Sequence, residues 1–150
     1  MKFIKKVVMA IGMDDDMVER LKPVESMDFL QNCEVHFVTV FNTLNYGFVM
    51  GDIPLVYPVE ADRKAIELSI NDMLKNTSKQ ILPANFAGKL VFKCLFDQNP
   101  KALFSTYVED VEADLVIIAA REKKGFFESS FTQYVSKHTR ANLLVLKPSR

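Results

Sequence analysis

One stretch of the sequence carries the residue types that hold a phosphate group. The apolar run 116–119 ends in a polar segment that contains Gly125 and leads to two serines, Ser129 and Ser130. Three basic side chains between them could neutralise an anion: Arg121, Lys123 and Lys124. Glycine lets backbone amides approach a phosphate closely, and the amides at the start of a helix receive its charge. If a helix begins near Ser130, this segment could bind a phosphate.

The same residues also fit a plain connection between a strand and a helix. Ser130 and Gln133 have the spacing of a capping box, in which each side chain covers a free amide at the helix start. Glu122 and Glu128 dilute the positive charge of the segment, which is typical of a solvated loop. We favour the connection, because it requires nothing beyond the residues present.

Other groups that could do chemistry lack partners at a useful spacing. The aspartates at 14–16 are successive and point in different directions on a helix, so we expect them to favour a helix start rather than chelate a divalent ion. Cys33 and Cys94 lie far apart among apolar residues, which predicts two buried, reduced thiols. We expect His36 and His138 to pack within a strand and a helix. The sequence therefore predicts neither an enzyme nor a metal site.

Composition and charge narrow the class of partner. The chain has 150 residues, enough for one domain with a full core, and its 19 basic and 19 acidic side chains cancel. A neutral chain has no long-range field to gather nucleic acid or anionic lipid, so we expect neither partner. The first residues lack the apolar core of a secretion signal, and we expect a cytoplasmic protein.

The elements that would position these residues alternate along the chain. Apolar runs predict strands at 6–11, 33–41, 89–96, 115–119 and 142–146, and Lys93 in the middle of the third favours an edge position. Helical spacing predicts a first helix that is kinked at Pro23 or restarts there, a second over 61–81, a third capped by Asn99 with Pro100 in its first turn, and a fourth from Ser130. Such alternation predicts an α/β fold with a parallel sheet covered by helices on both faces.

Several candidate residues follow the carboxyl ends of these strands, where doubly wound folds bind ligands. They are Gly12, the segment 42–60, Asp97 and the stretch described first. The segment 42–60 is long and unusually apolar for a connection, so it could form a lid over an apolar cleft. Exposed aromatic residues need cover, so Phe126 and Phe127 would either fold over an empty cleft or contact a second subunit.

Three segments resemble the C-terminal half of the universal stress protein family: 113–118, 130–135 and 143–148. The run from Val7 to Gly12 is similar to the family's first strand, and Asn99-Pro100 falls where its third helix begins. The resemblance implies one domain with the strand order 3-2-1-4-5 that this family shares with adenine nucleotide alpha hydrolases. It also implies a role in the stress response, a signalling protein as partner, and a homodimer paired through Asn142–Leu146, whose open edge would then be satisfied.

The resemblance also bears on ATP, which some members bind and others do not. Binders carry glycine, two residues, glycine, nine residues, and then glycine with serine or threonine. Here Ala119 and Glu122 fall on the first two glycines, the loop is shorter, and Gly12 replaces an aspartate that helps to hold the nucleotide. We therefore expect a module that binds no ATP.

Two alternatives remain open. One is a diverged ATP-binding protein that would hold ATP with magnesium through Gly12, Val40, Ala119, Gly125, Ser129 and Ser130. The other is a carrier of a small apolar ligand with its lid at 42–60.

Overall fold

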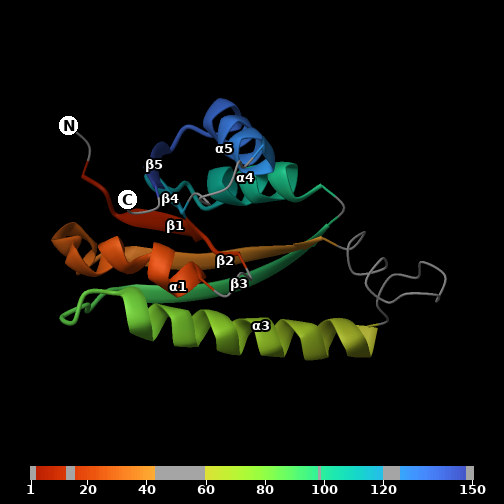
Figure 1. The fold of residues 1–150 in the computed structure, drawn as a ribbon, viewed down its shortest axis with the longest axis horizontal. Coiled ribbons are helices and arrows are strands. Elements are labelled where there is room, and N and C mark those ends of the chain that lie inside the picture. Colours follow the sequence, from red (N-terminus) through yellow and green to blue (C-terminus); the bar gives the residue numbers. More distant parts are fainter. Residues whose placement is uncertain (1–2, 13–15, 43–59, 98, 120–125, 148–150) are drawn as a thin grey trace.

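The computed structural model of the chain describes residues 3–12, 16–42, 60–97, 99–119 and 126–147 (Figure 1). The strands are β1 (Lys6–Ala10), β2 (Glu34–Asn42), β3 (Lys89–Asp97), β4 (Leu115–Ala119) and β5 (Asn142–Leu146). The helices are α1 (Met17–Arg20), α3 (Glu60–Ile81), α4 (Pro100–Asp110) and α5 (Phe126–His138), and two short 3-10 helices are η1 (Lys22–Ser26) and η2 (Asp28–Leu30). The strands fall where the apolar runs predict them.

The five strands form one parallel sheet in the order β3-β2-β1-β4-β5. This is the predicted order, and β3 lies at an edge, as the exposed Lys93 in its middle indicates. The register aligns Ala10 with Val38 on one side and with Ile118 on the other. The carboxyl ends of β1, β2 and β4 therefore lie side by side.

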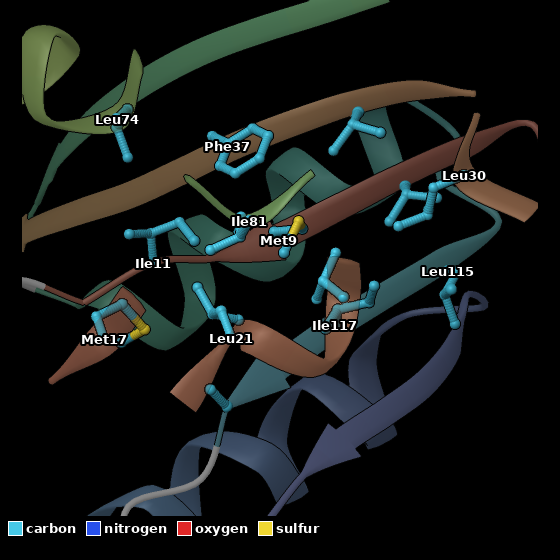
Figure 2. Packing of buried hydrophobic residues seen from close by; sticks show 14 of the residues in the cluster. Met9, Ile11, Met17, Leu21, Leu30, Phe37, Leu74, Ile81, Leu115 and Ile117 are labelled. Carbon is cyan, nitrogen blue, oxygen red and sulfur yellow. The ribbon is translucent and has the colours of Figure 1, made fainter. Parts of the chain in front are cut away.

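Helices cover both faces of the sheet (Figure 1). On one face, residues of α1, η1, η2 and α3 pack on alternate strand residues such as Met9, Phe37 and Ile117 (Figure 2). On the other face, α4 and α5 pack Phe104, Val108 and Val135 on the intervening residues of the strands. Central strands buried on both faces need continuous apolar sequence, and β4 is buried at all five positions.

The ends of two helices follow from local sequence. Pro23 lies in the first turn of η1, so the chain restarts there after α1, which is one of the two predicted outcomes. At the start of α4 the side chain of Asn99 accepts a hydrogen bond from the amide of Ala102 at 3.5 Å, as predicted.

The C-terminus of α4 is capped by Glu112 in a left-handed backbone conformation that residues other than glycine rarely adopt. The amide of Ala113 donates to the carbonyl of Val108 and that of Glu112 to the carbonyl of Glu109, each at 3.1 Å. These two bonds define a Schellman motif, whose penultimate position has left-handed backbone and usually carries glycine. Here Glu112 occupies it with φ 56°. The motif therefore carries backbone strain in an exposed turn.

Two predictions about α5 are wrong. The helix begins at Phe126, so Ser130 lies inside it and cannot form the predicted capping box at its start. Gly125 is the last helix breaker before this point, and nothing between it and Ser130 interrupts a helix. His138, predicted to be packed, is exposed at the last helical position. Its ring stacks on Tyr134 with centroids 3.9 Å apart, and its Nδ1 donates to the Tyr134 carbonyl at 2.9 Å.

Candidate functional site

The candidate site lies at the carboxyl edge of the sheet, at the switch point between β1 and β4. Strand order reverses there, because β1 pairs with β2 on one side and with β4 on the other. Gly12, Val40 and Ala119 lie at the carboxyl ends of these three adjacent strands. Sequence reasoning thus located three positions that the fold brings to one edge.

The other predicted site residues are not all placed by the structure. Gly125, Glu122, the basic residues of that loop and the segment 43–59 lie outside the described residues. Ser129 and Ser130 belong to α5, but their side chains also lie outside them. The lid over an apolar cleft and the cover formed by Phe126 and Phe127 stay predictions for the same reason.

Arg20 is a site residue that sequence reasoning missed. Its side chain is only 7% exposed, and Nη1 donates to the carbonyl of Ala119 at 3.0 Å. Its Nε lies 3.3 Å from Oδ2 of Asp16, an ionic contact without the geometry of a directed hydrogen bond. The spacing of Asp16 and Arg20 along the helix could have indicated this pair. Arg20 therefore ties α1 to the end of β4 at the switch point.

Ala119 itself belongs to the hydrophobic core on the sheet face that α1 and α3 cover. The residue is 5% exposed, and its carbonyl accepts the hydrogen bond from Arg20. The described part of this edge is thus built for packing and an internal hydrogen bond.

The opposite, amino edge of the sheet carries a pocket of about 510 Å³. Its lining includes Glu109, Glu112, Asp114 and Arg140. Asp114 uses Oδ2 to accept hydrogen bonds from the amides of Lys5 and Lys6, at 2.9 and 3.0 Å, and so fixes the start of β1. Arg140 donates its amide to Glu109 at 3.2 Å. These contacts give the pocket walls a structural role.

His36 is buried in β2, as predicted, but its partners could not be read from the sequence. Its Nε2 lies 2.7 Å from Oε2 of Glu34, and its Nδ1 lies 2.6 Å from the hydroxyl of Tyr107 on α4. The hydrogen bond to His36 is the largest cause of a lowered pKa of Glu34, although partial burial opposes it. Burial, followed by the charge of Glu34, raises the pKa of Tyr107.

The two cysteines are free and buried, as predicted. Burial raises the pKa of Cys94 to about 11, and burial with the charge of Asp114 raises the pKa of Cys33. Raised pKa values keep thiols protonated and unreactive. Within the described residues, no cluster of three or more histidine, cysteine or acidic side chains could hold a metal ion.

The two edges of the sheet differ in how they meet solvent. On β3 the exposed residues Lys89 and Lys93 are charged, which discourages pairing with another strand. On β5 the residues Leu143–Leu146 are uncharged and all partly buried. The β5 edge therefore lacks the charges that protect the β3 edge.

No helix in the described part of the chain has the length and apolar character needed to span a bilayer.

The structure is similar to solved structures of the universal stress protein family. The hypothetical protein MJ0577 aligns with a TM-score of 0.72 at 19% identity, over 99% of both chains. A universal stress protein in complex with cAMP aligns at 0.65 and 12%, over 99% of this chain and 100% of that one. A universal stress protein family protein from Arabidopsis thaliana with AMP bound aligns at 0.56 and 14%, over 97% and 92%.

These structural matches confirm the resemblance seen in the sequence at the level of the fold. At such low identity they carry the architecture rather than the chemistry. No protein-family model matches the sequence. No curated protein matches it either.

Proposed function

We propose that the chain is a cytoplasmic module of the universal stress protein type, which acts in the stress response as a homodimer and binds no ATP. Its role would be regulatory or protective, exercised on a signalling protein rather than through catalysis. The fold and its structural neighbours support the general assignment. The observation that carries the rejection of ATP is that Ala119 and Glu122 stand where the binding motif has its first two glycines.

The chemistry of the candidate site supports this choice. A polyphosphate needs close backbone approach and free amides at a helix start. Ala119 replaces a glycine of the binding motif, and Gly12 replaces its aspartate. Because α5 begins at Phe126, Ser130 is displaced from the free amides of the first turn.

A second candidate function is that of a diverged nucleotide binder. Two observations favour it: Gly12, Val40 and Ala119 lie near the carboxyl ends of adjacent strands, and two structural neighbours hold cAMP and AMP. ATP with magnesium would then be held by these three residues with Gly125, Ser129 and Ser130.

Calorimetric titration with Mg-ATP and with AMP separates the two candidates. We expect no binding heat for either nucleotide. Micromolar affinity that Ser130→Ala weakens would overturn the proposal. Ser136→Ala, at an exposed position of the same helix, is the matched control and should change nothing.

The β5 edge supports the dimer, because an uncharged open strand gains hydrogen bonds by pairing across a two-fold axis. Val145 on β5 and Val91 on β3 are both partly buried, and neither is among the described side chains packed against the two cores. We expect wild type and Val91→Lys to sediment as dimers and Val145→Lys as a monomer. A monomeric wild type across micromolar concentrations would contradict the dimer.

A further inference from the structure

The chain Glu34, His36 and Tyr107 has one direction of hydrogen bonding when His36 is neutral. An ionised carboxylate only accepts, so Nε2 of His36 must carry the proton that it shares with Glu34 at 2.7 Å. In neutral His36 the other nitrogen, Nδ1, then holds a lone pair, and the hydroxyl of Tyr107 donates to it at 2.6 Å. The phenol of Tyr107 is thus hydrogen-bonded to a basic nitrogen of His36, and the other ring nitrogen of His36 is hydrogen-bonded to the carboxylate of Glu34.

We propose that Tyr107 is a proton-coupled redox site, at which an outer-sphere one-electron oxidant takes an electron from the phenol while its proton passes to His36. The O–H bond of Tyr107 breaks, an N–H bond forms at Nδ1 of His36, and the oxidant is reduced by one electron. The products are a neutral phenoxyl radical and an imidazolium ion.

The surroundings of His36 favour this proton transfer. The imidazolium would lie 2.7 Å from the Glu34 carboxylate, and the pair would attract each other although the Glu34 side chain is 26% exposed and partly screened by water. Lys89 on β3 lies 4.0 Å from the other oxygen of Glu34 and helps to keep it ionised. The proton also moves along an existing hydrogen bond, so no side chain has to turn.

Tyr107 stands out among the tyrosine and cysteine side chains that the structure describes. The sequence has no tryptophan, and the two thiols are buried and protonated. Tyr134 stacks on His138, but that histidine directs Nδ1 to a backbone carbonyl rather than to the phenol. Tyr107 is only partly buried, so an oxidant in solution can reach its ring. This activity does not depend on the proposed function or on any ligand at the carboxyl edge.

Flash oxidation of the full chain tests the proposal, with photogenerated ruthenium(III) tris-bipyridine as oxidant and transient absorption of the phenoxyl radical as readout. Tyr46→Phe and Tyr57→Phe form the background, which leaves Tyr107 and Tyr134 as the tyrosines. We expect a fast phase at neutral pH that slows in deuterium oxide. Tyr107→Phe should remove this phase, and Tyr134→Phe should leave it.

Glu34→Gln gives a second, independent measurement that keeps His36 and Tyr107 in place. The fast phase should slow, because a neutral amide no longer compensates the imidazolium. Persistence of the phase in Tyr107→Phe, or the absence of an isotope effect in the background protein, would overturn the proposal.

Discussion

Arg20 donates a hydrogen bond from Nη1 to the carbonyl of Ala119, which lies 99 positions further along the chain. The bond joins α1 to the carboxyl end of β4, at the point where the strand order reverses. The Arg20 side chain is nearly excluded from water, and Ala119 is buried. A polar bond in such a place holds the two elements in one arrangement.

Replacing Arg20 with alanine should lower the free energy of unfolding by about 1–3 kcal/mol, because it leaves a buried carbonyl without its donor. Urea denaturation of wild type and variant measures the difference. Lys22→Ala is the matched control: this exposed side chain has a weak ionic contact with Glu25 at 3.9 Å and should change stability by less than about 0.5 kcal/mol. Equal effects of the two variants would show that the bond to Ala119 contributes little.

The strands could be predicted from the sequence because burial on both faces leaves an unbroken apolar run, as in β4. The start of α5 could not, because the capping-box spacing of Ser130 and Gln133 also occurs within a helix. Arg20 was missed for a different reason. Its spacing from Asp16 is local, but the carbonyl of Ala119 becomes its neighbour only through the fold.

Glu34 should stabilise the protein at neutral pH, and this contribution should be lost in acid. Its pKa lies below the ordinary value of 4.5, chiefly through the hydrogen bond to His36, so its contribution is present above that pH and is lost as the pH falls through the folded-state pKa. Unfolding by urea at a series of pH values measures this contribution in wild type and Glu34→Gln. We expect wild type to be the more stable at pH 7, and the difference to shrink below pH 4.5. A constant difference across the acid range would contradict the assigned role of Glu34.

Gly88 should tolerate no side chain, because it packs against the backbone at the start of β2. A Cβ at this position would lie 2.0 Å from the carbonyl oxygen of Cys33. Since the obstacle is backbone rather than a mobile side chain, Gly88→Ala should destabilise the protein by about 1–3 kcal/mol. Thermal unfolding gives the shift, and Ala87→Ser, at the exposed neighbouring position, serves as the control. A melting temperature unchanged in Gly88→Ala would mean that the two segments separate without cost.

Glu112 offers a substitution that should stabilise the protein. It holds left-handed backbone with φ 56° at the end of α4, a conformation that costs a residue with a side chain roughly 1–2 kcal/mol. Glycine adopts it freely but loses more entropy on folding, so the net gain of Glu112→Gly should be about 0.5–1 kcal/mol. Asp110→Gly, two positions earlier and still helical, should instead destabilise by a similar amount. Opposite shifts in the melting temperatures of these two variants are the expected result. A loss of stability in both would show that the carboxylate of Glu112 contributes more than its backbone strain removes.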